Sequence, residues 1–185
     1  MSDVERLFIC SVHRFPMEEV EPAEAVADKG FRECIHGRPG SKRQVSMIAA
    51  ETLESLGAEP GWVKENTTTR GLDMKQLHPG QRLRIGEALL EVAVPCNPCP
   101  RMDEIRQGLQ EELRGQRGWL CRVVETGQVR RGDAIEILNL EPETKSIEHK
   151  IPGSKTVGRH HHGIRYGSAG DDGSSKDAGI IRHRV

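Results

Sequence analysis

Short apolar runs separated by turn-rich polar blocks restrict the fold of this chain more than any other feature of its sequence. Such runs occupy residues 4–12, 45–48, 82–85, 88–94, 119–125 and 134–138. Glycine, proline and polar side chains fill the stretches between them. Runs of this length bounded by such breaks are typical of β-strands. The sequence therefore predicts a mainly β fold, a barrel or a sandwich, with a few short helices and no β–α–β rhythm.

Two stretches have helical character. Residues 49–57 (AAETLESLG) have helical spacing and end at Gly57, which suits a helix C-terminus. Residues 102–115 (MDEIRQGLQEELRG) predict a second helix, which Gly108 weakens. Further along, residues 126–128 (TGQ) are typical of a hairpin turn before the last strand.

The composition changes at Glu141. The segment from there on is rich in glycine, serine, lysine and aspartate and poor in apolar residues. It cannot bury enough surface to offset the conformational entropy of ordering the chain. We predict one domain over residues 1–140 and a disordered tail over residues 141–185. The three histidines His160–His162 could bind metal loosely, although a solvated tail is the simpler interpretation.

Charge and cysteine content exclude several classes of protein. Lysine and arginine number 27 against 28 aspartate and glutamate, so no global basic field attracts nucleic acid or an anionic membrane. No apolar run approaches the roughly 20 residues that a membrane span needs, and the N-terminus lacks the pattern of a secretion signal. The chain has 5 cysteines, an odd number that argues against a complete disulfide framework. We expect a cytoplasmic protein whose ligand is a small molecule.

The stretch VAVPCNPCPRMDEI places Cys96 and Cys99 between a predicted strand and a predicted helix. A structural zinc site needs four ligands, usually from two Cys-x-x-Cys pairs, and only one pair is present. Cys34 and His36 could supply two more ligands, so a zinc site stays an alternative. The Cys-x-Pro-Cys form also fits a thioredoxin-like dithiol. That motif is persuasive inside a β–α–β pattern, which the sequence does not predict. Two structural cysteines at a strand end are the remaining alternative, and Cys121 is expected to be a buried core residue.

Three polar blocks lie next to the predicted strands, at residues 36–46, 65–71 and 113–118. They carry the side chains His36, Arg38, Ser41, Lys42, Arg43, Asn66, Thr67, Thr68, Thr69, Arg70, Arg114 and Arg117. Cations and hydroxyls on a flexible backbone bind phosphate or carboxylate oxygens, although loops are often polar without any such role. Because closure of a barrel would gather the blocks around the cysteines, we predict an anion-binding pocket there.

The ordered combination of these stretches resembles the MOSC domain family, named after the C-terminal domain of molybdenum cofactor sulfurase, in its compact stand-alone bacterial type. The resemblance covers residues 4–138 and rests on HGRPGSKRQVSMI, ENTTTRGLD, LHPGQRLRIGEALLEV, PCNPCPRMDEI and LRGQRGWLCRVVETGQVRRGDAIEIL. It implies a β-barrel with a few short helices that binds the molybdenum cofactor, a pterin dithiolene carrying a phosphate. Many members have Gly and Asp where this chain has Glu33 and Cys34, so no role of that aspartate is carried over, whereas His36 is retained.

The resemblance also implies roles for single residues. In the amidoxime-reducing relatives the second cysteine of Cys-x-x-Cys ligates molybdenum. This position corresponds to Cys99 here, and Cys96 is the alternative ligand. A soft thiolate suits that metal. Asn66 matches a cofactor-contacting asparagine, and His36 is the candidate proton donor. The full set of cofactor-binding candidates is Ser41, Lys42, Arg43, Asn66, Thr67 and Arg70.

The implied activity is an oxidoreductase that reduces small N-hydroxylated or related N–O substrates. No flavin or iron–sulfur motif is visible, so electrons would come from a reductase partner. The alternative is a sulfur carrier that holds a persulfide on Cys99, received from a PLP-dependent cysteine desulfurase for metal–sulfur cluster or cofactor assembly. A non-catalytic cofactor-binding module is a third possibility.

Overall fold

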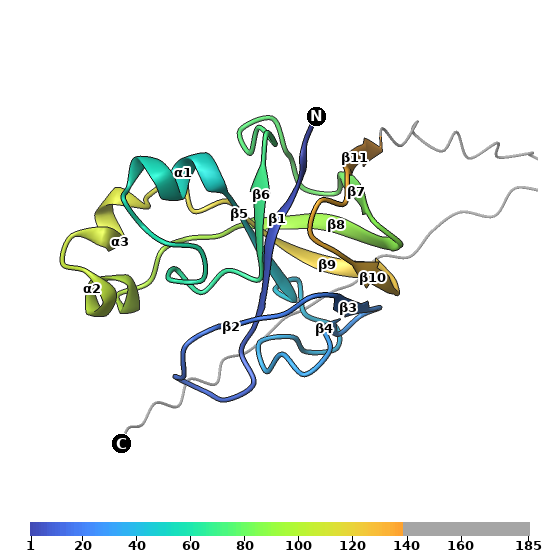
Figure 1. The fold of residues 1–185 in the computed structure, drawn as a ribbon, viewed down its shortest axis with the longest axis horizontal. Coiled ribbons are helices and arrows are strands. Elements are labelled where there is room, and N and C mark those ends of the chain that lie inside the picture. The colour runs from blue at the N-terminus through green and yellow to red at the C-terminus, as the bar shows by residue number, and fades with distance from the viewer. Residues whose placement is uncertain (139–185) are drawn as a thin grey trace, which may run out of the picture. The chain divides into compact units, whose positions relative to one another are not determined.

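A computed structural model of the protein describes residues 1–138 (Figure 1). The predicted tail and its three histidines lie outside these residues. Strands predominate in the described part, as the sequence predicts, and helices are few and short. The main sheet contains, in spatial order, β11 (Ile135–Leu138), β7 (Arg82–Ile85), β8 (Ala88–Pro95), β9 (Trp119–Glu125), β5 (Val45–Ala49), β6 (Thr67–Arg70), β1 (Asp3–Ile9) and β2 (Glu18–Glu19).

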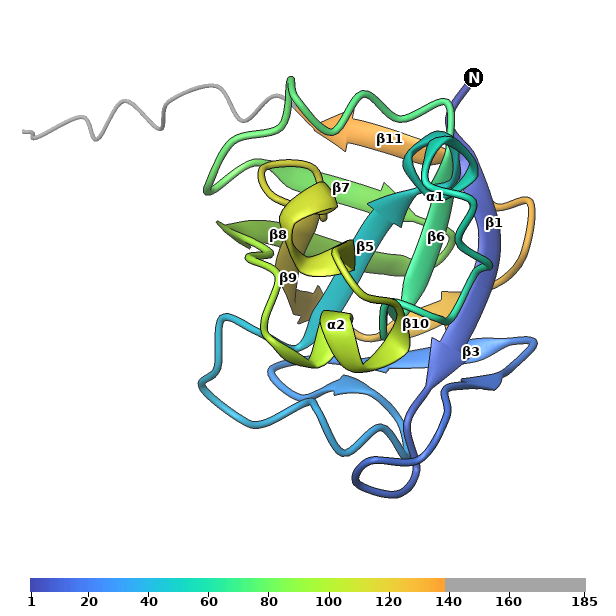
Figure 2. The same cartoon turned by 90° about the vertical axis from the view of Figure 1, so that its left-hand side faces the viewer.

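This sheet curls until the start of β1 meets the start of β11. Ser2 O accepts a hydrogen bond from Ile135 N at 2.9 Å, and Val4 N donates to Asp133 O at 3.0 Å. An antiparallel bridge joins Asp3 to Ala134 between them. The curled sheet with β1 and β11 near one another is visible in Figure 2. Closure of this kind removes a sheet edge and confirms the predicted barrel.

One β–α–β unit is present, so the prediction that the chain has none is wrong. β5 continues into α1 (Ala50–Ser55), and β6 returns parallel to β5 with Met47 opposite Thr67. The sequence does not indicate this unit, because β6 has the sequence TTTR, which contains no apolar side chain. The cysteine pair lies elsewhere, between the antiparallel strands β8 and β9, so the argument against a thioredoxin-like dithiol still holds.

The second predicted helix is interrupted at the glycine that was expected to weaken it. The chain forms α2 (Arg101–Ile105) and α3 (Leu109–Glu112), and Gly108 between them has φ +85°. Figure 1 shows α1, α2 and α3 on the same side of the sheet. Apolar side chains of the helices, of β5 and of the adjoining loops form a second core cluster of Ile48, Leu53, Ala58, Val63, Met102, Leu109 and Leu113.

A smaller sheet contains β10 (Gly127–Val129), β3 (Ala23–Val26) and β4 (Gly30–Phe31), in that order. The predicted hairpin turn at residues 126–128 is therefore wrong, since Gly127 pairs with Ala25 of β3. A Cβ at Gly127 would lie 2.3 Å from the backbone carbon of Glu87. This glycine permits close packing of two backbones, which a sequence does not distinguish from a turn.

Aliphatic side chains fill the barrel. Val45, Met47, Leu83 and Val92 are fully buried there. Cys121 of β9 is also fully buried, and burial raises the pKa of its thiol to about 12, so the expected core role is confirmed. The helices of the described residues are all too short or too polar to cross a membrane.

Candidate functional site

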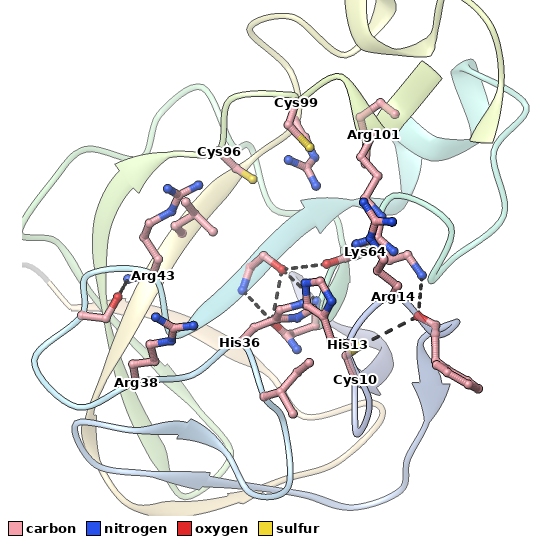
Figure 3. A pocket seen from close by; sticks show the side chains of 18 residues that line it. Cys10, His13, Arg14, His36, Arg38, Arg43, Lys64, Cys96, Cys99 and Arg101 are labelled. Carbon is pink, nitrogen blue, oxygen red and sulfur yellow. Dashed lines mark hydrogen bonds between the residues drawn. The ribbon is translucent and has the colours of Figure 1, made fainter. Parts of the chain in front are cut away.

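A cavity of about 800 Å³ opens beside α2 at one end of the barrel. Its walls come from the residues after β1, the loop before β5, the residues before β6, the two-cysteine loop and the start of β9 (Figure 3). Loops that follow several strands of a closed sheet converge at one rim, which gathers polar side chains from distant parts of the chain. The cavity is lined by Cys10, His13, Arg14, Phe15, Ile35, His36, Arg38, Ser41, Arg43, Ser46, Lys64, Asn66, Cys96, Cys99, Arg101, Met102, Arg117 and Leu120.

Most of the candidates from the sequence meet in this cavity. Those that line it are His36, Ser41, Arg43, Asn66, Cys96 and Cys99, together with Arg38 and Arg117 of the polar blocks. Lys42 is exposed and is absent from the lining, although both its neighbours belong to it. The polar block around Ser41 therefore contributes alternate side chains to the cavity.

Thr67 and Arg70 lie outside the cavity because their segment is a strand of the barrel wall rather than a loop. Thr67 is 1% exposed and pairs with Leu7 of β1. Arg70 is three residues further along β6, about 10 Å at the rise of a strand. There its guanidinium forms ion pairs with Glu5 and Glu54, each at 2.5 Å. Arg70 therefore links β6 to β1 and α1 through its two ion pairs and does not line the cavity.

Asn66 combines a cavity position with a structural role. Its side-chain oxygen accepts bonds from the backbone N of Ser46 at 3.1 Å and from Ser46 Oγ at 3.2 Å. Its nitrogen donates to the Phe8 carbonyl at 3.1 Å and to Cys34 Sγ at 3.3 Å. The side chain is 2% exposed and joins β1, β5 and the loop of Cys34. It fixes the floor of the cavity.

The two cysteines of the Cys-x-x-Cys differ in their surroundings. Cys96 is buried, and burial raises the pKa of its thiol although Arg117 and Arg43 act against this. Cys99 is exposed and faces the cavity. Both are free thiols in the structure. No group of three or more potential metal ligands forms among residues 1–138, so the zinc alternative has no ligand set there.

A third cysteine lies directly behind the cavity. Cys34 Sγ is 4.0 Å from Nδ1 of His36 and accepts the bond from Asn66. Burial acts to raise the pKa of this thiol, but hydrogen bonds from the His36 side chain, from the backbone at Cys10 and His36, and from Asn66 outweigh it and lower the pKa to about 7. Cys34 therefore carries a partial negative charge next to His36 near neutral pH.

Cations dominate the lining. Six lysine or arginine side chains face the cavity and no carboxylate does: Arg14, Arg38, Arg43, Lys64, Arg101 and Arg117. None of the six forms an ion pair within the described residues, whereas arginines at nine other positions do: Arg6, Arg32, Arg70, Arg82, Arg84, Arg106, Arg114, Arg122 and Arg130. The Nε of Arg117 is buried without a hydrogen-bond partner. A second cavity, of about 500 Å³, has the mixed charges of Glu51, Asp73 and Lys75 instead.

Sequence reasoning missed six of the polar or ionisable lining residues: Cys10, His13, Arg14, Ser46, Lys64 and Arg101. Most of them lie in the segment after β1, in the segment before β6 or at the start of α2, where no motif singles them out. Arg14 and Lys64 have φ of 71° and 65°, a region that non-glycine residues rarely occupy. Such backbone strain gathers at binding sites but is visible only in the folded chain.

The fold is a curled β-sheet of the barrel type with three cysteines and six cations in one cavity at its end. The model of the MOSC domain family matches residues 33–136, more than half of the chain, and this protein belongs to that family. As a family, MOSC domains are associated with binding of the molybdenum cofactor. The expected family and fold are therefore confirmed.

Known proteins support the same family. The protein YiiM of Escherichia coli is 32% identical over 81 residues, a segment that covers 40% of this chain and 35% of YiiM. Among solved structures, the YuaD protein of Bacillus subtilis superposes with a TM-score of 0.65 at 22% identity, over 74% of this chain and 96% of YuaD. YiiM of Geobacillus stearothermophilus gives a TM-score of 0.60 at 18% identity, over 75% of this chain and 76% of that one. These structures share the fold of this protein.

Proposed function

We propose that this protein binds the molybdenum cofactor in the cavity and acts as an oxidoreductase on small N-hydroxylated or related N–O compounds. The observation that carries the proposal is the combination of the exposed Cys99 with six unpaired cations in one cavity. The association of MOSC domains with this cofactor supports it.

The lining fits a phosphorylated pterin that carries a soft metal. A volume of about 800 Å³ lies within the usual range for small-molecule sites. Arg38, Arg43 and the hydroxyl of Ser41 supply donors for a phosphate. Arg117 adds positive charge, while its terminal nitrogens donate to the carbonyls of Asn97 and Val63. The sulfur of Cys99 is a soft ligand of the kind that such a metal prefers.

When bound, the cofactor would supply a redox-active metal that can accept the oxygen atom of an N–O group. The residues of the chain then have distinct roles. Cys99 offers its sulfur at the exposed position, while the buried Cys96 remains a protonated thiol beside it. His36, which lines the cavity, is held by Cys34 and is the candidate proton carrier.

The reaction requires partners outside this chain. Reductive cleavage of an N–OH bond consumes two electrons and two protons and yields N–H and water. Protons would pass through His36, whereas the electrons would come from a reductase partner. The exposed position of Cys99 favours one second candidate function, a sulfur carrier, because a PLP-dependent cysteine desulfurase could reach that thiol to transfer a persulfide sulfur.

Metal analysis tests the proposal. Protein made in a host that produces the cofactor is expected to contain about one molybdenum and one pterin per chain. Arg43→Gln is expected to lower cofactor affinity by ~10-fold or more, since a charge-assisted hydrogen bond contributes about 1.5–3 kcal/mol. Arg131→Gln is the matched control, because Arg131 is exposed, forms no ion pair within residues 1–138 and lies outside the cavity.

Activity of the cysteine variants completes this test. Cys99→Ser is expected to abolish reduction of an N-hydroxylated compound, whereas Cys121→Ala, in the barrel core, leaves the site residues in place. The proposal would be contradicted if wild-type protein contained no molybdenum and if Cys99→Ser had the same activity as wild type. Persulfide on Cys99 after incubation with a desulfurase and cysteine would support the sulfur carrier, and bound cofactor without turnover would support a non-catalytic module.

A further inference from the structure

Five of the six cavity cations, all except Arg117, form two groups on opposite sides of the cavity. Figure 3 shows Arg38 and Arg43 on one side of the cavity and Arg14, Lys64 and Arg101 on the other. We call the second group the Lys64 corner. A single phosphate bound by Arg38 and Arg43 leaves the Lys64 corner without a bound anion, and no residue among 1–138 forms an ion pair with this corner.

Without a ligand, the positive charges of the Lys64 corner repel one another. Burial lowers the pKa of Lys64, and the positive charge of Arg101 lowers it further. Like charges held this close repel one another unless an anion lies between them. Cys10 and Glu65 act in the opposite direction on this pKa but do not outweigh the lowering. The carboxylate of Glu65 accepts hydrogen bonds from Gly61 N and Thr68 Oγ1 and does not line the cavity.

The backbone holds these cations in place despite strain. Lys64 Nζ donates to the carbonyl of Phe15 at 2.9 Å, which ties the loop of Arg14 to the segment before β6. Arg14 and Lys64 both have positive φ, as only four non-glycine residues do among residues 1–138. The strained backbone at Arg14 and Lys64, and the bond from Lys64 to the residue after Arg14, favour a pre-positioned corner over freely moving surface side chains.

We propose that the Lys64 corner is a second oxyanion subsite, which binds a carboxylate or phosphate of the substrate while Arg38 and Arg43 hold the cofactor phosphate. The reducible N–O group would then lie between the corner and Cys99, and the protein would select anionic substrates over neutral ones. The apolar side chains of Phe15, Ile35 and Met102 line the same cavity and suit an apolar body between the two groups. The choice of substrate rests on the proposed function, whereas the subsite does not.

Alkylation of Cys99 tests the subsite without any cofactor. The Cys99 thiolate displaces iodide from iodoacetate, an anion, or from iodoacetamide, its neutral analogue, and forms a C–S bond in both cases. The ratio of the two rates at Cys99 is measured by mass spectrometry of the peptide. In Lys64→Gln and Arg101→Gln the ratio is expected to fall by about 5-fold or more, since a cationic cleft concentrates anions locally. Arg131→Gln leaves it unchanged. A ratio that is equal in all four proteins overturns the subsite.

A matched pair of substrates tests the selection. Loaded protein is assayed with benzamidoxime and with the same compound carrying a 4-carboxylate. Lys64→Gln and Arg101→Gln are expected to raise KM for the carboxylate by about 10-fold with KM for the neutral compound unchanged. Molybdenum and pterin content are measured on the same samples and are expected to equal those of wild type. Loss of cofactor from these two variants would assign the corner to the cofactor and overturn the inference, whereas wild type without cofactor would refute the proposed function alone.

Discussion

Cys34 lies behind the cavity wall, where its sulfur meets the side chains of Asn66 and His36. Neither its burial nor its partners are visible in the sequence, which marks only a departure from the family pattern at this position. Other single residues were predictable because they belong to motifs, and Cys99, Arg43 and Asn66 do gather in the cavity. The Lys64 corner was not predictable, since contact between distant loops brings its cations together.

The altered pKa of Cys34 predicts a pH dependence of stability. Folding lowers this pKa from 9.0 to about 7, so between these pH values the native state has lost a proton that the unfolded chain still holds. The free energy of unfolding therefore rises with pH across this window. From pH 7 to pH 9, wild type is expected to gain on the order of 1–2 kcal/mol over Cys34→Ser, and to lose this gain as the pH falls back through 7. Urea unfolding of both proteins at pH 7, 8 and 9 measures the difference, and parallel stability curves would contradict it.

The short helices are the elements that support the two-cysteine loop. Met102 of α2 and Leu109 of α3 join the second core cluster, in which Leu113 is fully buried. The sequence predicted these helices and most strands of the main sheet, because apolar periodicity specifies such elements directly. It failed for β3, β6 and β10, which are short or polar and are strands only because distant partners pair with them.

Truncation of a side chain in this cluster is expected to lower the stability of the protein. Leu113→Ala is expected to lower the free energy of unfolding by about 2–5 kcal/mol, as for other fully buried leucines. Ile137→Ala is the control, because Ile137 is 40% exposed and its truncation is expected to cost less than ~1 kcal/mol. Chemical denaturation measures both. Equal losses in the two variants would show that the helices do not depend on this cluster.

The whole molecule depends on a single closure of its sheet, where the N-terminal segment meets the residues before β11. Val4→Pro removes the N–H that donates to Asp133 O, whereas Val4→Ala keeps it. The proline variant is expected to be less stable than the alanine variant by about 1–3 kcal/mol, the cost of losing this hydrogen bond and leaving the carbonyl of Asp133 without its donor. Thermal unfolding of the pair measures this, and equal melting temperatures would argue against closure as a source of stability.

The same closure has a consequence for the order of events during synthesis. Ser2 Oγ bonds to the carbonyl of Ile135, a separation of 133 residues along the chain. Contacts this remote in sequence form slowly, and they cannot form before the ribosome has released nearly the whole domain. Every residue that lines the cavity lies between the two closing segments. A nascent chain therefore has no complete pocket to offer a ligand until residues 133–135 have emerged from the ribosome.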